Sequence, residues 1–291
     1  MGSRSGSGRG AHPERNRRVE VENTEVGVAT SNTTTSLGAR LRAHGGDFGA
    51  FILRVDCCVS TNDLALLYAK QAAPHGSLFL AREQSGGRGR FKRRWESAPG
   101  GLYLSILLRP ESGDFPPSLL PLLSAVSTAE AIREMCGLDV RLRWPNDLYV
   151  NERKLAGILC EGSFKGSRAE VFVVGIGVNV AQPQESFGVE VRARATSISG
   201  ISGDALETEA VAARVVSRFE LWWREREAAR VLSRWRELAA VDGGRTVLVQ
   251  PRDGESYHAV IHGLADDGGL AVEVADGTRR VLYSADVLYL R

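Results

Sequence analysis

The sequence of 291 residues has few cysteines, no long apolar run and almost no excess charge. Its four cysteines show neither the paired spacing of a zinc site nor the density of a disulfide-stabilised fold, so we expect reduced thiols. They are Cys57, Cys58, Cys136 and Cys160. No apolar run approaches the ~20 residues that cross a bilayer, and the N-terminus lacks the apolar core of a signal peptide. We expect a soluble, cytoplasmic protein with no membrane partner.

The lack of net charge restricts the possible partners. The sequence has 37 basic and 35 acidic residues, a formal charge of +2. So small a charge draws the protein neither to nucleic acid nor to anionic lipid, so any cationic function must be local. The contents of 43% hydrophobic and 25% charged residues are typical of a globular chain. A chain of this length can form a large domain and a small one.

Several catalytic motifs are also missing. The sequence has no G-x-x-x-x-G-K-[ST] motif, so an ATP site here would not use a Walker loop. GIGVN at 175–179 opens no predicted helix, which argues against a dinucleotide fingerprint. His258 and His262 lie in a predicted strand, where this spacing sets them too far apart to share a zinc ion. There is no G-x-S-x-G elbow, and no cysteine has an evident histidine partner. An enzyme of this sequence need not supply its own nucleophile.

Composition divides the chain into three parts. Residues 1–47 are rich in Gly, Ser, Thr, Asn and Arg, which predicts a disordered or loosely ordered arm with one short helix near 37–43. Residues 48–241 mix helical and strand patterns, which predicts an α+β domain. Residues 242–291 read as short strands broken by glycine, which predicts a small all-β domain.

Periodicity and capping signals predict the elements of the larger domain. Ser60 is a candidate N-cap, and Gly137 is a candidate stop signal for a later helix. The expected helices cover 61–73, 119–136 and a long helical region at 206–240. The expected strands cover 77–81, 102–108, 140–144, 154–161 and 170–180.

The segment GGRGRFKRRW at 86–95 has five basic residues between Gly87 and Arg94. It is either a nucleic-acid-binding arginine–glycine element or a loop that closes over an anionic small molecule. Arginine–glycine elements usually repeat within disordered regions. This segment occurs once, between two predicted strands, which favours the loop.

A second polar segment, RWPNDLYVNERKLAGIL, covers 143–159. Asn146 and Asp147 end one predicted strand and Lys154 begins another, so a hairpin directs all three toward one pocket. The same residues also fit a plain turn with a solvated lysine. The small residues Ala156 and Gly157 beside Lys154 favour a site, because glycine in a strand often marks close approach of a ligand.

Six motifs occur in the order found in bacterial biotin protein ligases, a family that the chain resembles from about residue 51 to its end. The resemblance is weakest in the C-terminal part. It implies a central mixed or antiparallel sheet with helices, like that of class II aminoacyl-tRNA synthetases, and a small C-terminal SH3-like β-barrel. The motifs are STN at 60–62, EQSGGRGRFKRRW at 83–95, GGLYLSILLRP at 100–110, RWPNDLYVNERKLAGIL at 143–159, VVGIGVNV at 173–180 and ATSI at 195–198.

The resemblance implies a two-step ligase. Such enzymes join biotin to ATP as biotinyl-5′-AMP, release pyrophosphate, and pass biotin to a lysine of a biotin carboxyl carrier domain. ATP, Mg²⁺ and biotin are the expected small molecules, and carrier domains of enzymes such as acetyl-CoA carboxylase are the expected protein partners. The first step brings two anions together, so we expect Arg88, Arg90 and Lys154 to be catalytic cations. Asp147 is expected to orient the metal or a water molecule.

The resemblance also implies the binding residues. Biotin is expected to contact Ser60, Thr61, Asn62, Gln84, Gly86, Gly87, Arg88, Lys154 and Gly157. ATP or the adenylate is expected to contact Arg88, Arg90, Trp95, Asn146, Lys154, Asn179 and Ala195. Mg²⁺ is expected to bind through the ATP phosphates, with Asp147 as the candidate protein ligand.

The basic loop leaves two points open. We expect the glycines at 86, 87 and 89 to let the loop close over the adenylate. Lys92, Arg93 and Arg94 either contact pyrophosphate or form a solvated flank.

Residues 1–50 are too short and unpatterned for a winged helix-turn-helix, so we expect the family type that lacks a DNA-binding repressor domain. We expect a monomer or weak homodimer without a nucleic-acid partner. One alternative is a lipoate or octanoate protein ligase of the same fold; the WPNDL segment and the GRGR-to-Trp segment favour biotin. The other is an RNA-binding protein that uses the basic loop.

Overall fold

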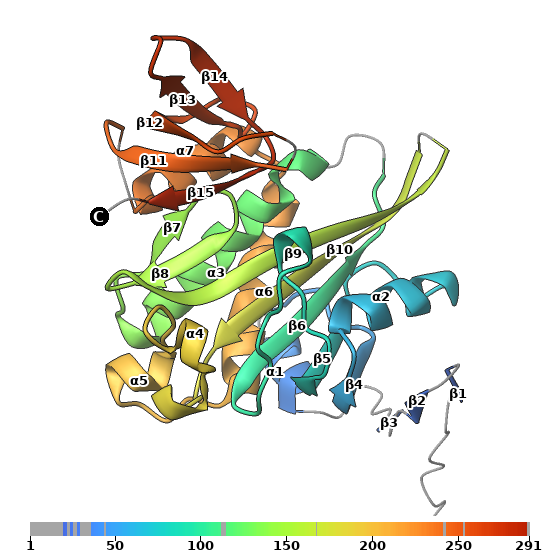
Figure 1. Ribbon diagram of the computed structural model, residues 1–291. Coiled ribbons are helices and arrows are strands. Elements are labelled where there is room, and N and C mark those ends of the chain that lie inside the picture. Colours follow the sequence, from blue (N-terminus) through green and yellow to red (C-terminus); the bar gives the residue numbers. More distant parts are fainter. Residues whose placement is uncertain are drawn as a thin grey trace, which may run out of the picture.

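The computed structural model describes residues 20–21, 24–25, 28–29, 36–43, 45–111, 115–166, 168–240, 243–252 and 254–289. Within these residues the fold consists of a large mixed sheet flanked by helices and a smaller antiparallel sheet at the C-terminal end (Figure 1). A separate pair of short strands, β1 (Glu20–Val21) and β2 (Thr24–Glu25), lies near the N-terminus. The described residues include no helix that is both long enough and apolar enough to span a bilayer.

The large sheet has the strand order β3-β4-β5-β6-β10-β9-β8-β7. β4 and β5 are parallel, and every other neighbouring pair is antiparallel. β9 and β10 form a long hairpin in which Gly157 lies opposite Gly177. The strands are β3 (Val28–Ala29), β4 (Ile52–Cys58), β5 (Ser77–Gln84), β6 (Gly101–Leu108), β7 (Arg141–Arg143), β8 (Asp147–Val150), β9 (Arg153–Lys165) and β10 (Arg168–Asn179).

Helices cover both faces of the large sheet (Figure 1). One face packs against α1, α3, α6 and α7 in a core that includes Leu104, Ile132 and Phe219, all fully buried. The other face packs against α2 in a core that includes Ala65, Phe79 and others. The helices are α1 (Ser36–Ala43), α2 (Thr61–Lys70), α3 (Leu120–Cys136), α4 (Val189–Arg192), α5 (Ile198–Ser202), α6 (Thr208–Glu225) and α7 (Ala228–Leu238).

Two helix ends follow their sequence signals. Ser60 caps α2, because its Oγ accepts a hydrogen bond of 3.3 Å from the Asn62 N–H. Gly137 ends α3 in the left-handed region at φ 66°, and its N–H donates to the Arg133 carbonyl at 2.9 Å. The long helical region expected at 206–240 differs in one respect. It breaks at Arg226, whose φ of 55° ends α6 before α7 begins.

The N-terminal helix is confirmed as α1, and it is part of the core. Leu37 and Leu41 are 2% and 4% exposed, and the helix packs on α6. The packed chain therefore begins before Phe48, where we expected it to start. Most of the arm expected at 1–47 lies outside the described residues.

The C-terminal sheet is antiparallel, with the order β14-β13-β12-β11-β15. Among the described residues β14 and β15 are not paired, so the sheet is not closed. Trp144 joins this sheet to the larger one, since its Nε1 donates to the Gly268 carbonyl at 3.0 Å. The strands are β11 (Thr246–Pro251), β12 (Tyr257–Leu264), β13 (Leu270–Val274), β14 (Arg279–Leu282) and β15 (Ala285–Tyr289).

Candidate active site

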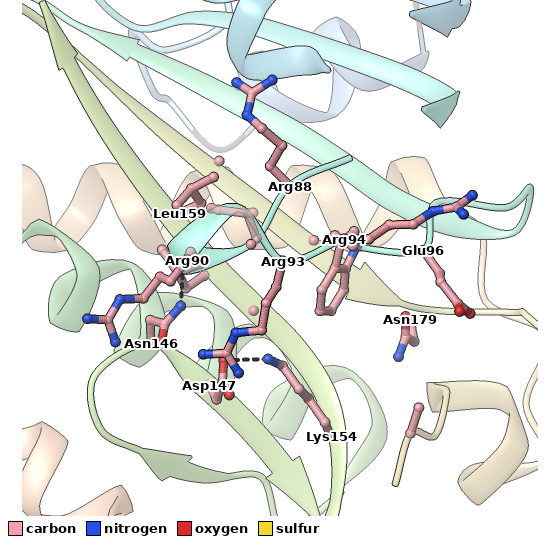
Figure 2. Close-up of a pocket in the computed structure, with 18 of the residues that line it drawn as sticks. Arg88, Arg90, Arg93, Arg94, Glu96, Asn146, Asp147, Lys154, Leu159 and Asn179 are labelled. Atoms are coloured by element: carbon pink, nitrogen blue, oxygen red, sulfur yellow. Dashed lines mark hydrogen bonds and ion pairs between the residues drawn. The ribbon is translucent and has the colours of Figure 1, made fainter. Parts of the chain in front are cut away.

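A cavity of about 360 Å³ lies over the β9–β10 hairpin, bounded by the basic loop and by β15. Of the residues expected at the site, only Gly86 and Gly87 do not line it. Figure 2 shows Asn146, Asp147, Lys154 and Asn179 around this space. The expected residues that line the cavity are Ser60, Thr61, Asn62, Gln84, Arg88, Arg90, Trp95, Asn146, Asp147, Lys154, Gly157, Asn179 and Ala195.

The basic loop is a paired tongue. We call residues 87–95 the basic tongue, because its two arms are joined by backbone hydrogen bonds. The Trp95 N–H donates to the Gly87 carbonyl at 2.9 Å, and the Gly89 N–H donates to the Arg93 carbonyl at 2.7 Å. The chain reverses through Phe91 and Lys92, with φ of 55° and 58°. The left-handed positions are thus filled by non-glycine residues, a strained arrangement that the pairing of the arms maintains.

Close packing accounts for two of the glycines at the tongue. A Cβ at Gly87 would lie 2.4 Å from Ser97 Oγ and 2.6 Å from the Trp95 carbonyl oxygen, and a Cβ at Gly86 would lie 2.8 Å from Val59 Cγ1. At Gly89 the nearest atom would be 3.7 Å away, an ordinary contact. Space therefore requires glycine at 86 and 87 but not at 89. Closure of the loop over a ligand stays a prediction.

One end of the cavity is a buried polar network. The Thr61 N–H donates to Gln84 Oε1 at 2.8 Å, and Gln84 Nε2 donates to Ser97 Oγ at 2.9 Å. Ser105, which is fully buried on β6, bonds Thr61 Oγ1 at 2.8 Å. Ser60 and Thr61 are 5% and 4% exposed. These groups are held in fixed orientations, so they can recognise a ligand with matching donors and acceptors.

The cavity wall also holds a lysine–aspartate pair. Lys154 Nζ lies 2.7 Å from Asp147 Oδ1, which fulfils the expected meeting of the two hairpin residues (Figure 2). The backbone of Lys154 is fixed on both sides, by the Arg194 carbonyl at 2.7 Å and the Thr196 N–H at 3.0 Å. Asn146 Nδ2 donates to the Ile158 carbonyl at 2.6 Å. The ammonium group is thus positioned at the cavity wall and about one third exposed.

The indole of Trp95 lies against Gly157 on β9 and Gly177 on β10, which form the floor of the cavity. A Cβ at Gly157 would lie 3.2 Å from Trp95 Cζ3, and one at Gly177 would lie 2.7 Å from Cε2. Lys154 Nζ is 5.4 Å from the centroid of the Trp95 ring. Trp95 Nε1 is buried without a hydrogen-bond acceptor. The GIGVN segment is not a dinucleotide fingerprint. Its two glycines, Gly175 and Gly177, instead line the floor of the cavity.

Asn179 and Ala195 lie side by side at the end of β10. Asn179 is 4% exposed and its Nδ2 donates to the Thr196 carbonyl at 2.9 Å. Glu96 Oε2 accepts a hydrogen bond of 2.8 Å from the Gly188 N–H, which ties the segment after the tongue to α4. This side of the cavity is walled by the segment that runs from Phe187 to Ala195.

Arg88 differs from the expected arrangement. Its guanidinium donates to both carboxylate oxygens of Asp63 at 2.7 Å and to Glu161 Oε2 at 3.2 Å. The hydrogen bond with Asp63 raises the pKa of Arg88 above its ordinary value. Figure 2 shows this side chain directed away from Lys154. Arg88 thus borders the cavity, but its charge is already paired with carboxylates.

The C-terminal sheet completes the site. Arg90 Nη1 donates to the Ala285 carbonyl at 3.1 Å, and Arg93 forms an ion pair with Asp286. Burial lowers the pKa of Arg90 below its ordinary value, because the charged form loses hydration; the charge of Asp286 opposes this. The basic tongue is therefore held against β15.

Several lining residues could not be identified from the sequence. Asp286, Val287 and Leu288 follow the tongue by about 195 positions, and no local pattern marks them. Tyr103, Phe187, Val191 and Arg194 also line the cavity and carried no signal of their own.

Family matches agree with this geometry. Residues 55–179 match the Biotin/lipoate A/B protein ligase family, and residues 242–289 match the Biotin protein ligase C terminal domain. Two curated relatives cover most of the chain. The bifunctional ligase/repressor BirA of Bacillus spizizenii is 32% identical over 243 residues, 82% of this chain and 74% of the relative. The biotin–[acetyl-CoA-carboxylase] ligase of Paracoccus denitrificans is 33% identical over 237 residues, 79% of this chain and 97% of the relative.

A solved structure shares the fold. The biotin protein ligase of Aquifex aeolicus in complex with biotin and ATP has a TM-score of 0.71 and 26% identity, over 82% of this chain and 99% of that one. The two matched regions hold the lining residues from Ser60 to Asn179 and from Asp286 to Leu288, while the wall from Phe187 to Ala195 lies between them. The chain belongs to the bacterial biotin protein ligases.

Proposed function

We propose that the protein is an ATP-dependent biotin protein ligase, which forms biotinyl-5′-AMP and transfers biotin to a lysine of a biotin carboxyl carrier domain. One observation carries this proposal: a single cavity is lined both by a fixed polar network and by Lys154 with basic tongue residues. Biotin has a polar ureido ring, an apolar chain and a carboxylate, in that order. The cavity wall holds polar, apolar and cationic groups that match these three parts.

In the first step a carboxylate oxygen of biotin attacks the α-phosphorus of ATP. A new P–O bond forms, the bond between the α-phosphorus and the bridging oxygen breaks, and pyrophosphate leaves with the electron pair. Negative charge builds up between two anions, so cations already in place lower the barrier most. Lys154 and Arg90 line the cavity and serve this purpose, at about 3 kcal/mol for each well-placed group.

In the second step the neutral amine of the acceptor lysine attacks the acyl carbon of the adenylate. The C–N bond forms, the C–O bond to AMP breaks, and the amine loses its proton. The enzyme needs no nucleophile for this step. Burial raises the pKa of the Cys58 and Cys160 thiols to about 12, which keeps them protonated and unreactive.

Mg²⁺ would enter with the ATP phosphates. The described residues contain no group of three or more His, Cys, Asp or Glu side chains that could hold a metal ion by themselves. This fits a magnesium ion whose ligands are mostly phosphate oxygens and water, as in other ATP sites. Asp147 is the candidate protein ligand, although one of its oxygens already pairs with Lys154. When bound, the ion would supply charge neutralisation at the phosphates.

A lipoate or octanoate ligase is the second candidate, because the matched family includes lipoate ligases. The polar network argues for biotin. The dithiolane ring of lipoate and the chain of octanoate carry no N–H or carbonyl, so they could add no hydrogen bond to the network around Thr61 and Gln84, whereas the ureido ring of biotin could. The match of residues 242–289 to a biotin ligase domain supports the same choice.

RNA binding by the tongue is the third candidate. Arg88 and Arg93 are already paired with carboxylates, which reduces the positive charge that the tongue could offer to a phosphate chain. The proposal therefore treats this segment as part of the ligase cavity.

We further propose the finer organisation of the protein. The catalytic domain covers 48–241 together with helix α1 and resembles class II aminoacyl-tRNA synthetases, while 242–291 form an SH3-like barrel. The antiparallel order of β11–β15 supports the latter. We also propose a cytoplasmic monomer or weak homodimer. Sedimentation tests the oligomeric state, and a crystal structure of the C-terminal sheet tests whether the barrel closes.

Pyrophosphate exchange tests the function. Purified protein with Mg²⁺-ATP is incubated with labelled pyrophosphate and biotin, lipoate, octanoate or no acid. Biotin-dependent label in ATP is expected, with biotinylation of a carrier domain but not of a carrier whose acceptor lysine is changed to Arg. Exchange with lipoate alone identifies the second candidate. Absence of exchange with every acid, together with RNA binding that requires the tongue, identifies the third.

A further inference from the structure

Four side chains form a hydrogen-bonded ring beside the polar end of the cavity, completed by the backbone between Asn62 and Asp63. Asn62 and Asp63 lie in the first turn of α2, Arg88 is the first basic residue of the tongue, and Glu161 lies on β9. Asn62 Nδ2 donates to Glu161 Oε2 at 2.7 Å, and Arg88 donates to Glu161 and to Asp63. We call these four residues the anchor ring. None of the roles derived above uses Asp63 or Glu161.

Asn62 is fully engaged within the protein. It is 3% exposed, and its Nδ2 donates to the Leu159 carbonyl at 3.2 Å as well as to Glu161. Its Oδ1 accepts a hydrogen bond of 2.6 Å from Ser105. Asn62 therefore holds the first turn of α2 against the sheet, and this turn carries Ser60 and Thr61 into the cavity. The side chain sets the position of the polar network.

Arg88 is the anchor of the tongue. One nitrogen, Nη2, donates to Asp63 Oδ1 at 2.7 Å and to Glu161 Oε2 at 3.2 Å. Two carboxylates surround one guanidinium, so the group has no spare positive charge to offer a distant anion. Its contacts fix the start of the tongue to both α2 and β9.

We propose that Glu161 is a positioning residue that couples the substrate-binding turn of α2 to the basic tongue. The inference rests on the proposed function and extends it. The same oxygen, Oε2, accepts from Asn62 and from Arg88, so a shift in either donor changes the geometry offered to the other. Occupation of the polar end holds the turn that carries Ser60 and Thr61, and through Asn62 and Glu161 it holds the tongue over the cavity.

A substitution of Asp63 can distinguish coupling of the tongue to the α2 turn from simple anchoring of the tongue. It binds Arg88 with two hydrogen bonds of 2.7 Å, and it has no bond to the side chain of Asn62 among the described contacts. Asp63→Asn weakens the anchor alone. Glu161→Gln weakens the anchor and the charge-assisted bond to Asn62 together, while keeping the size of the side chain.

The experiment compares these two variants with a matched control. Glu170→Gln makes the same chemical change on the neighbouring strand β10, at an exposed residue outside the ring. Two measurements are made: the KM for biotin and for ATP in pyrophosphate exchange, and the rate of trypsin cleavage within the tongue, with and without biotin. The five basic residues of the tongue are trypsin sites.

Glu161→Gln is expected to raise the KM for biotin by about 3- to 10-fold, because the variant loses a partly exposed charge-assisted hydrogen bond. Its KM for ATP should stay within about twofold of the wild-type value. It should also weaken the protection that biotin gives the tongue. Asp63→Asn is expected to speed tongue cleavage while the KM for biotin changes less than about twofold. Glu170→Gln should match wild type in both measurements.

Two results overturn the coupling. If Glu161→Gln leaves the KM for biotin unchanged, or if both ring variants raise it equally, Glu161 is only an anchor. A loss of kcat with equal rises in both KM values, together with a lower melting temperature, indicates a merely structural role. Failure of the proposed function looks different: wild type itself then shows no biotin-dependent exchange, whereas trypsin still reports whether the ring anchors the tongue.

Discussion

The pairing of Lys154 with Asp147 leads to a prediction that two substitutions can test. Lys154 Nζ is 2.7 Å from Asp147 Oδ1, and the two side chains are 32% and 25% exposed. Lys154→Met keeps most of the length of the side chain and removes its charge. The variant loses a cation that acts on the developing charge, which costs about 3 kcal/mol or 10²-fold. It also leaves the Asp147 carboxylate facing the phosphates.

The repulsion between the unpaired Asp147 carboxylate and the phosphates can be estimated. A carboxylate about 5 Å from a phosphate charge, at an effective dielectric of about 20, is repelled by about 3 kcal/mol. Solvent reaches both side chains, so we halve this to about 1.5 kcal/mol, roughly tenfold in rate. Lys154→Met should therefore slow adenylation by about 10³-fold. The double variant Lys154→Met, Asp147→Asn should recover about tenfold of that loss.

The measurement is single-turnover formation of biotinyl-5′-AMP with quenched sampling, so that product release does not hide the chemical step. Asp147→Asn alone is the matched control for the second change. A single variant within about tenfold of wild type refutes the catalytic role of Lys154. A double variant slower than Lys154→Met refutes the repulsion argument and indicates instead that Asp147 holds the metal.

Three further predictions concern packing and titration. Gly87→Ala should lower the adenylation rate at least about tenfold, because a Cβ at this position would lie 2.6 Å from a backbone oxygen. Gly89→Ala should stay within about threefold of the wild-type rate, because Gly89 has φ −109° and room for a Cβ. Equal rates for the two variants contradict the packing argument. Phe219→Ala should lower the free energy of unfolding by about 3–5 kcal/mol in urea, since the ring is fully buried. At pH 8 iodoacetamide should label exposed Cys57 well before Cys58, because burial raises the pKa of Cys58 in the folded state from the ordinary 9.0 to about 12; equal labelling of both thiols contradicts this. Because the folded pKa is the higher one, the contribution of Cys58 to the free energy of unfolding is present below pH 9 and is lost as the pH rises toward 12.

Local chemistry in the sequence predicted the elements and many of the site residues. Ser60 and Gly137 mark helix ends through bonds within a few residues, so their effect is visible without the fold. Asp147 and Lys154 meet because a short hairpin joins their strands. Each of these cases depends on neighbours in the chain.

The parts that were missed depend on tertiary contacts. Arg88 was expected to screen phosphate, but α2 and β9 bring Asp63 and Glu161 to its guanidinium from positions 25 and 73 residues away. Charge patterns alone do not reveal which acids a basic loop will meet. The glycines at 86 and 87 were interpreted as flexible points, and the close atoms that require them became visible only in the folded structure.

The contact between the tongue and β15 has a consequence for synthesis of the chain. Arg90 and its acceptor at Ala285 are 195 residues apart. At about 5–20 residues per second, the ribosome makes the tongue roughly 10–40 s before the strand that holds it. The cavity of a nascent chain therefore lacks one wall until the last strand has emerged. A chain released before residue 285 keeps every lysine and arginine of the site and still has no complete cavity.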